Sequence, residues 1–475
     1  MKNWALPFFI SLVFFSCQSP TTPTAKTPNI IVILTDDQGY QDLGSFGSPD
    51  IKTPYLDQMA REGVRLTSFY SAQAVCSASR AGLLTGCYPN RIGIHGALMP
   101  NSKKGINSNE TTLAELLKTK GYRTGIFGKW HLGDHPQFSP LKHGFDTYFG
   151  IPYSNDMWPL HPQQGKGFNF GPLPLYENEQ IIDTLTDQSQ LTTLLTEQAV
   201  DFINRKKDDP FFLYVAHPQP HVPLYVSEKF KGKSANGLYG DVIMELDWSV
   251  GQIIQALKDN GLEENTLVVY TSDNGPWLSY GNHAGSAGQL REGKGTAWEG
   301  GQREPFIVKY PPRIKGGSII DVPIMGIDLL PTIANLTGAS LPERTIDGKD
   351  VLPLLTQEST ESPHEAYFFY YDINQLQGVR YGEYKLYFEH TYRTMAGQPQ
   401  GKDGLPGDYT YITLDEVELY HLPTDPGERT NIAEKHPEVV AKIEALADEM
   451  RLKLGDALRD QTGSEVREPA YTGRD

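Results

Sequence analysis

The stretch Asn29–Thr35, which reads NIIVILT, is followed directly by Asp36 and Asp37. A continuous apolar run of this length is typical of a strand that is buried on both faces of a parallel sheet. In open α/β sheets, ligands bind beyond the carboxyl ends of the strands. This stretch therefore predicts both the fold class and the place of a functional site.

Similar apolar runs recur along the chain and alternate with helical patterns. The runs lie at residues 124–127, 211–216, 266–271 and 305–310, and the helical patterns lie at residues 55–62, 112–118, 191–206 and 239–258. This alternation predicts an α/β domain in which helices cover both sides of a central mixed, mostly parallel sheet.

After about residue 361 the pattern changes. Residues 377–389 predict a hairpin, residues 418–421 a short strand and residues 436–454 an amphipathic helix. We therefore expect a large domain over residues 29–364, a small α+β domain with an antiparallel sheet over residues 365–460, and a tail over residues 461–475.

The first 17 residues predict a signal peptide of the bacterial lipoprotein type. Lys2 precedes the apolar stretch Trp4–Phe15, and Cys17 follows it. The stretch is too short to span a membrane comfortably. We expect export to the cell envelope, at the periplasm or the outer membrane surface, with a lipid anchor at Cys17 as the only membrane contact and a tether over residues 18–28. Ordinary secretion with cleavage nearby is the alternative.

Composition limits the possible partners. The chain has 475 residues, of which 39% are hydrophobic and 21% charged, as is typical of a soluble globular enzyme. Its net charge of -16 argues against binding to nucleic acid. An anionic substrate would need a local cationic pocket, because the overall field repels it.

Oxygen-bearing side chains follow two of the predicted strands. Asp36 and Asp37 follow the first strand, and Asp273 and Asn274 follow the strand at residues 266–271. Each pair alone would suit a turn or a helix cap. Together, carboxylates and an amide without Cys or His favour a hard cation, with Ca²⁺ more suitable than Mg²⁺.

A cysteine and an arginine lie together in residues 76–80, which read CSASR. Arg80 begins a predicted helix over residues 80–84. The N–H groups and the positive dipole at a helix start, with the guanidinium of Arg80, would hold a tetrahedral oxyanion facing Cys76. A buried structural cysteine is the alternative. Three cysteines make a poor disulfide framework, and we do not expect a bond between Cys76 and Cys87.

Other cationic and titratable residues lie at strand ends and in a loop. Lys129 and His131 point to the same side if the extended backbone continues, and would suit oxyanion binding and proton transfer. His217 and His221 flank prolines, and each alone would also suit an ordinary surface loop. Lys294 lies in a glycine-rich loop with room to approach a small anion.

Together these motifs resemble those of the formylglycine-dependent sulfatases of the arylsulfatase type, in the alkaline phosphatase superfamily. The resemblance covers nearly the whole chain after the tether and implies an alkaline-phosphatase-like large domain. Its most specific element is Cys-x-Ala-x-Arg at 76–80, where Ala78 stands in place of the more common proline. Further matches are Leu-Thr-Gly at 84–86, Gly-Lys-Trp-His-Leu-Gly at 128–133, Ser-Asp-Asn-Gly at 272–275 and Glu-Gly-Gly-x-Arg-Glu-Pro at 299–305.

The resemblance implies a nucleophile and a metal site. A maturation enzyme would oxidise Cys76 to formylglycine (3-oxoalanine), whose hydrated aldehyde would be the nucleophile. The implied Ca²⁺ ligands are Asp36, Asp37, Asp273 and Asn274.

The resemblance also implies roles for five basic residues. Arg80 and Lys129 would hold the formylglycine in place, and His131 would be the base that breaks down the sulfated intermediate. His221 and Lys294 would contact the sulfate and assist departure of the alcohol.

Substrate contacts are indicated less directly. Ser154 lies in a segment, residues 150–154, that resembles animal arylsulfatases, and His217 is a further candidate contact outside the core set. We expect sulfated glycan fragments as substrates, because aromatic residues that suit sugar rings crowd residues 136–182, although they would equally suit a core. These aromatic residues are Tyr148, Phe149, Tyr153, Trp158, Phe168 and Phe170.

Two other functions remain open. A phosphate or phosphonate ester hydrolase of the same superfamily is one, although dizinc phosphatases usually have Asp-His where this chain has Asp273-Asn274. The other is a non-catalytic glycan-binding lipoprotein, although every proposed ligand and catalytic position is filled.

Overall fold

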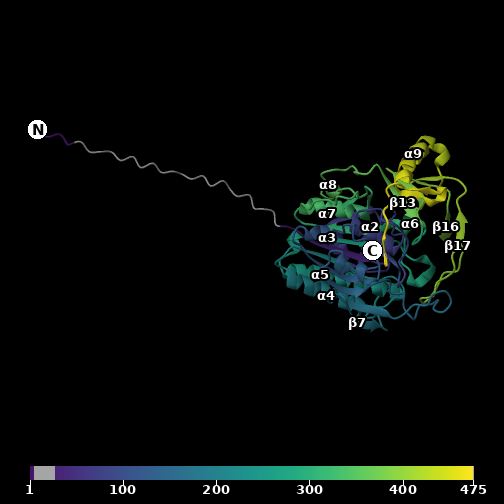
Figure 1. Ribbon diagram of the computed structural model, residues 1–475, viewed down its shortest axis with the longest axis horizontal. Coiled ribbons are helices and arrows are strands. Elements are labelled where there is room, and N and C mark those ends of the chain that lie inside the picture. Colours follow the sequence, from purple (N-terminus) through teal and green to yellow (C-terminus); the bar gives the residue numbers. More distant parts are fainter. Residues whose placement is uncertain (5–26, 474–475) are drawn as a thin grey trace.

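The computed structural model describes residues 1–4 and 27–473, and its centre is one large mixed sheet (Figure 1). Strands β9, β1, β8, β4 and β5 are parallel to one another, whereas β10 and the β6–β7 hairpin are antiparallel to their neighbours. In spatial order the strands are β11 (Ser318–Ile320), β2 (Val64–Tyr70), β10 (Arg303–Lys309), β9 (Thr266–Ser272), β1 (Asn29–Thr35), β8 (Phe211–Ala216), β4 (Arg123–Lys129), β5 (Thr147–Ile151), β6 (Leu173–Glu177) and β7 (Gln180–Leu185). A further strand, β12 (Ile324–Met325), pairs with β2.

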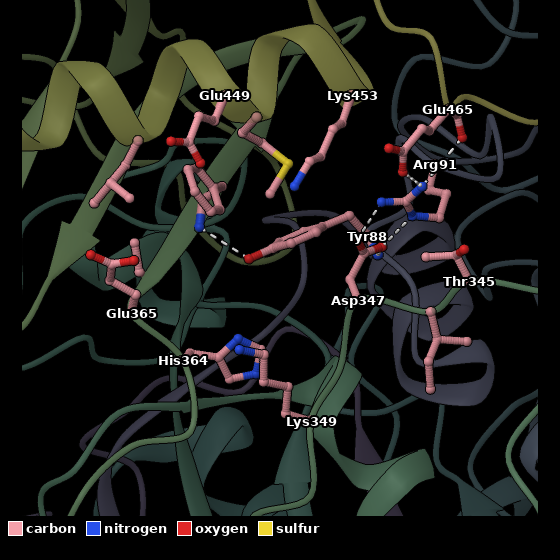
Figure 2. A pocket seen from close by; sticks show the side chains of 15 residues that line it. Tyr88, Arg91, Thr345, Asp347, Lys349, His364, Glu365, Glu449, Lys453 and Glu465 are labelled. Atoms are coloured by element: carbon pink, nitrogen blue, oxygen red, sulfur yellow. Dashed lines mark hydrogen bonds and ion pairs between the residues drawn. The ribbon is translucent and has the colours of Figure 1, made fainter.

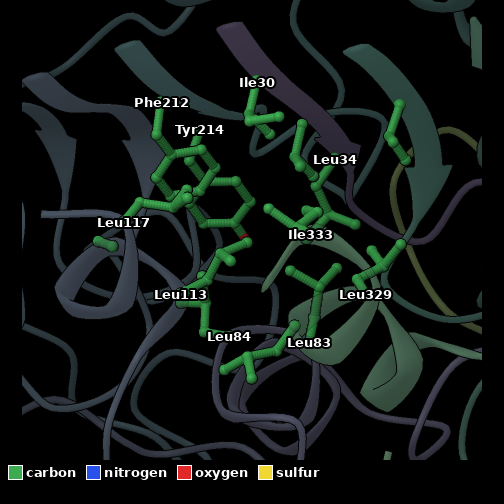
Figure 3. Packing of buried hydrophobic residues seen from close by; sticks show 14 of the residues in the cluster. Ile30, Leu34, Leu83, Leu84, Leu113, Leu117, Phe212, Tyr214, Leu329 and Ile333 are labelled. Atoms are coloured by element: carbon green, nitrogen blue, oxygen red, sulfur yellow. The ribbon is translucent and has the colours of Figure 1, made fainter. Parts of the chain in front are cut away.

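Helices cover both faces of this sheet, as Figure 1 shows. Alternate residues of β1 pack on opposite faces, which is why the strand reads as apolar throughout. Ile31 and Ile33 pack on the side of α1 (Pro54–Glu62), α4 (Leu191–Lys206) and α5 (Gly237–Asp259). Ile30 and Leu34 pack on the other side, where α2 (Cys76–Thr85), α3 (Leu113–Lys118) and α7 (Leu329–Thr337) contribute leucines and an isoleucine (Figure 3).

The C-terminal part forms a smaller antiparallel sheet, in the order β13 (Ala366–Tyr371), β14 (Gln375–Tyr381), β15 (Tyr384–Tyr387) and β18 (Glu418–His421). Helix α9 (Pro437–Leu454) covers it with Ile443 and Ala447. An arm formed by β16 (Thr391–Thr394) and β17 (Thr410–Thr413) extends from this domain. The remaining short elements are α6 (Glu299–Gln302), α8 (Leu352–Leu355), β3 (Lys104–Gly105), β19 (Gly455–Asp456), β20 (Gln461–Thr462) and β21 (Ala470–Tyr471).

Buried contacts fix the C-terminal domain on the large domain. Lys385 Nζ lies 2.8 Å from Glu299 Oε1, and both side chains are fully buried. A cavity of about 520 Å³, lined by both polar and apolar side chains, lies between the domains (Figure 2). At its edge, Arg91 pairs with Asp347 at 2.7 Å and with Glu465 at 2.9 Å.

The structure confirms the predicted fold class. Strand 211–216, helix 191–206 and strand 418–421 have the predicted bounds. The helix expected at residues 80–84 instead begins at Cys76, because the small side chains of residues 77–79 pack inside the protein. The apolar pattern does not predict the edge strands, which are short or partly exposed.

The segment expected to be a tail, residues 461–475, folds back on the protein over its described residues. β20 pairs with β19, and β21 pairs with β3 of the large domain. Cys17 and most of the expected signal peptide and tether lie outside the described residues, so their roles stay predictions. In the described parts of the chain, no helix is both long and apolar enough to cross a membrane.

Candidate active site

The parallel pairing of β1 and β9 places two polar pairs side by side at the carboxyl ends of the strands. Thr35 is opposite Ser272, so Asp36–Asp37 and Asp273–Asn274 follow their strands at the same edge of the sheet. The backbone N–H of Asp37 donates to Asp273 Oδ1 at 3.2 Å, and Asn274 Nδ2 donates to Asp37 Oδ1 at 2.7 Å. The four oxygen-bearing side chains therefore lie in one place.

This arrangement fits a bound cation. Asp36 Oδ1 and Asn274 Oδ1 are buried and have no hydrogen-bond partner among the described residues. Buried acceptors without a partner are costly, and a hard cation would satisfy both. Ligand atoms of Asp36, Asp37 and His221 lie within 4.8 Å of one another. His221 is not among the predicted ligands, because hard cations prefer oxygen donors.

Arg80 and Lys129 balance the buried acidic charge. Arg80 Nε and Nη2 donate to Asp273 Oδ2 at 3.0 and 2.8 Å, and Arg80 Nη2 lies 3.1 Å from Asp36 Oδ2. Lys129 Nζ lies 2.5 Å from the same Asp36 oxygen. Burial alone would raise the pKa of Asp36, but Lys129 and Arg80 hold that pKa well below its ordinary value. Asp36 is therefore ionised and available to a cation.

Cys76 is the first residue of α2 and is 2% exposed. Burial raises the pKa of its thiol, although the charges of Lys129 and Lys294 oppose that shift. The thiolate is the nucleophilic form of cysteine, so an unmodified Cys76 would be a weak nucleophile. Cys76 and Cys87 are both free thiols.

Lys294, His221 and Ser154 complete the cluster from other loops. Lys294 Nζ lies 2.7 Å from Asp37 Oδ1, and its charge also acts on Cys76. His221 Nε2 lies 3.5 Å from both Asp37 Oδ2 and Ser154 Oγ. The structure thus brings together Cys76, the four oxygen donors, and Ser154, Arg80, Lys129, His221 and Lys294.

The backbone at His131 is not extended, in contrast to the prediction. Strand β4 ends at Lys129, and the φ of 60° at His131 turns the chain, so the extended backbone does not continue. The positive charges of Lys129 and Arg80 nevertheless act on the His131 ring. Burial and these two cations hold the pKa of His131 well below its ordinary value. Nε2 lies 2.9 Å from the carbonyl oxygen of Leu98, and Nδ1 has no partner within the described chain.

The structure does not bring His217 to the cluster. The ring is fully buried, and Nε2 lies 3.2 Å from Ser249 Oγ on α5. Burial alone lowers the pKa of His217 to about 3, with no contribution from a charged group. This position favours a packing role over a substrate contact.

Replacing His217 by glutamine should therefore change stability without changing KM. The folded pKa of about 3 lies below the ordinary value of 6.5, so the unfolded chain binds a proton first as the pH falls. Between about pH 7.5 and about pH 5, this residue should cost the wild type about 2 kcal/mol of stability, and the variant should not show that loss. Urea unfolding at both pH values measures the difference. A pH-independent difference, or a raised KM, would contradict this placement.

The arm of the C-terminal domain supplies a contact that sequence reasoning missed. Arg393 Nε donates to the carbonyl oxygen of Lys294 at 3.2 Å, and Arg393 Nη2 donates to the same oxygen. Its guanidinium lies over the ring of Tyr409 at 4.5 Å. Tyr371, at the end of β13, packs against the small cluster formed by Val75, Cys76 and Ala78. No motif marks these residues, because they lie far from the site in sequence.

Replacing Arg393 by alanine should lower kcat, because the Lys294 loop loses the contact that positions it. We expect a decrease of about 10- to 100-fold, as for other losses of positioning near a reacting centre. Arg459→Ala, which removes an exposed arginine of the same domain, is the matched control and should keep full activity. Steady-state kinetics on a chromogenic sulfate ester, the substrate class that the sequence resemblance implies, measure both. Equal activity in the two variants would contradict the positioning role.

Comparisons with known proteins show the family of the chain. A family model described as Sulfatase matches residues 28–339, and one described as the C-terminal region of aryl-sulfatase matches residues 362–468. Human arylsulfatase A is 39% identical over 449 residues, which are 89% of this chain and 87% of that protein. The N-acetylgalactosamine-6-sulfatase of Canis lupus familiaris is 42% identical over 454 residues, 90% of this chain and 85% of that protein.

Among solved structures, Ps i-CgsB in complex with k-i-k-neocarrahexaose is similar with a TM-score of 0.76 and 27% identity, covering 92% of this chain and 95% of that chain. The family matches span both domains, and the curated relatives are similar over most of their own length. The chain therefore belongs to the sulfatase family and is a sulfuric ester hydrolase.

Proposed function

We propose that the protein hydrolyses sulfate esters of sulfated carbohydrates, using Ca²⁺ and a formylglycine formed from Cys76 by a maturation enzyme. The observation that carries this proposal is the buried cluster around Cys76. Four oxygen donors lie there with three cations, and two of the oxygens have no partner in the described residues. The donors are Asp36, Asp37, Asp273 and Asn274, and the cations are Arg80, Lys129 and Lys294.

When present, Ca²⁺ supplies positive charge to the sulfuryl oxygens, and formylglycine supplies a hydroxyl nucleophile with a second hydroxyl beside it. Lys129 and Lys294 flank Cys76 with positive charge, which suits an anionic sulfate ester. They are held in place by ion pairs with Asp36 and Asp37, so little reorganisation accompanies binding.

Two histidines can move protons at this cluster. His221 Nδ1 lies 2.6 Å from the carbonyl oxygen of Val222 and donates to it, which leaves Nε2 to face Asp37 and Ser154. In the imidazolium form of His221, Nε2 also carries a proton, and we assign that proton to the departing alcohol, which leaves the neutral ring with Nδ1 still bonded to Val222. His131 donates from Nε2 to Leu98 and stays neutral at working pH, so its Nδ1 can accept a proton.

The proposed carbohydrate substrate is supported by the relatives. One is named for the 6-sulfate of N-acetylgalactosamine, and one similar structure holds a neocarrahexaose. The proposed lipid anchor at Cys17 would place the enzyme at the cell envelope, where external glycans are processed.

Release of free sulfate tests the function. Defined sulfated oligosaccharides are compared with chromogenic sulfate, phosphate and phosphonate esters, using protein produced with a maturation enzyme. We expect turnover of sulfate esters, with sulfated sugars among the substrates. Faster release from the phosphonate ester would favour a phosphonate hydrolase, and no release from any ester would favour a glycan-binding protein.

A further inference from the structure

One wall beside the cluster contains polar groups that the chemistry above does not use. It begins at Ser154, which contacts His221, and continues through the loop to His161. Asp156 and His161 have side chains that are 10% and 7% exposed, and Asp156 Oδ2 lies 3.8 Å from His161 Nε2. Asp156 Oδ1 is buried without a partner in the described chain. An acceptor left open in this way suits a ligand that donates hydrogen bonds.

The tautomer of His161 follows from its second contact. The backbone N–H of Gln163 donates to His161 Nδ1 at 3.1 Å, so Nδ1 is the acceptor and Nε2 carries the proton. Phe168 and Phe170 pack their rings on His161 at 4.9 and 5.3 Å. The wall thus offers an acceptor and a donor side by side, with the imidazole held by two aromatic rings.

Trp277 and Tyr280 connect this wall to the cluster. The Trp277 ring lies 5.4 Å from His221 and 5.0 Å from Tyr280, and Lys294 Nζ lies over it at 4.5 Å. Trp277 Nε1 is also buried and unpartnered within residues 27–473. Tyr280 lies near both Asp156 and Lys294. Burial raises its pKa most, the charge of Asp156 raises that pKa further, and the charge of Lys294 lowers it.

We propose that Asp156, His161 and Trp277 form a subsite for the sugar ring that carries the sulfate ester. The inference rests on the proposed function, in which His221 marks the side of the departing alcohol. Vicinal hydroxyl groups can donate to Asp156 Oδ1 and accept from His161 Nε2 and Trp277 Nε1, while the indole face packs on the ring. An apolar aryl or steryl alcohol would leave the buried polar atoms unpaired, and a ring bearing a carboxylate there would be repelled by Asp156.

Most of the aromatic residues expected to contact sugar have another role. Tyr148, Phe149, Tyr153 and Trp158 are buried in the hydrophobic core. Phe168 and Phe170 are partly exposed, and their rings pack on His161.

The test compares two kinds of leaving group, a sugar and an aryl alcohol, in the same variants. Asp156→Asn and His161→Gln are assayed with N-acetylgalactosamine 6-sulfate, galactose 6-sulfate and 4-nitrophenyl sulfate. We expect kcat/KM to fall about 10- to 100-fold for the preferred sugar sulfate, as when a hydrogen bond to a buried charged group is lost, and less than about threefold for the aryl ester. Asp183→Asn, which changes an exposed aspartate of β7, is the matched control. It should leave kcat/KM unchanged for the sugar sulfates and for the aryl ester.

Thermal unfolding of each variant shows whether it keeps the fold. Equal losses for sugar and aryl esters, or no loss for the sugar, would overturn the subsite while leaving the proposed function in place. A wild-type enzyme that cleaves 4-nitrophenyl sulfate but neither sugar sulfate nor any sulfated oligosaccharide would overturn the proposed substrate class, and the subsite with it.

Discussion

The Cys76→Ala protein is expected to fold normally and to lose at least about 10,000-fold in kcat/KM for sulfate esters, as enzymes do when the nucleophile is removed. Alanine has no heteroatom that a maturation enzyme can convert to an aldehyde. Although the site is only 2% exposed, the change removes a single sulfur atom, so the cavity is small and the fold should tolerate it. Circular dichroism and steady-state kinetics on the same preparation measure both effects.

Cys87→Ala is the matched control for this variant. Cys87 is another buried free thiol on the same stretch of chain, but it contacts Thr345 and Arg467, away from the cluster. It should keep activity within about threefold, as expected for a residue outside the reacting site. A loss equal to that of Cys76→Ala would show that the effect comes from packing, and the nucleophile would have to be another residue.

The Asp37→Asn protein should lose about 1,000-fold in kcat, because one change disturbs the proposed metal ligands and two catalytic partners together. Asparagine keeps the shape but removes the charge that pairs with Lys294 at 2.7 Å and faces His221 at 3.5 Å. Breaking a buried ion pair from one side also destabilises a protein by about 3–5 kcal/mol. The unfolding midpoint should therefore fall with the activity.

Calcium titration separates the metal effect from the loss of stability. Chelation should inactivate the wild type, added Ca²⁺ should restore it more fully than Mg²⁺, and Asp37→Asn should need more Ca²⁺ for half of its remaining activity. Asp42→Asn is the control, since Asp42 is equally buried but bonded to Tyr239 and to the backbone of Gly39. An unchanged Ca²⁺ requirement in Asp37→Asn would remove Asp37 from the ligand set.

Local patterns in the sequence were enough to predict the centre of the molecule. The apolar run at Asn29–Thr35 indicates a two-sided buried strand, and side chains directly after such strands meet at one edge of a parallel sheet. Asp36 and Asp273 therefore lie where the pattern predicts, on paired strands. Their proposed use as metal ligands rests on the donor chemistry and stays to be tested.

Other features depend on contacts that no local pattern contains. Arg393 reaches the Lys294 loop only because the C-terminal domain packs on the large one. The chain turns at His131, beyond the end of β4, and His217 packs against α5 instead of facing the site. Asp156 and His161 lie in an irregular insertion, where neither helical nor strand periodicity predicts which side chains point inward.

Mass spectrometry of the peptide that spans position 76, combined with activity assays, tests the central claim most directly. The protein is produced with and without a formylglycine-generating enzyme, and each preparation is assayed with 4-nitrophenyl sulfate at saturating Ca²⁺. The account predicts that specific activity rises in proportion to the fraction of the peptide in which the thiol has become an aldehyde, and vanishes when that fraction is zero. Full activity in protein whose residue 76 is entirely an unmodified thiol would contradict it.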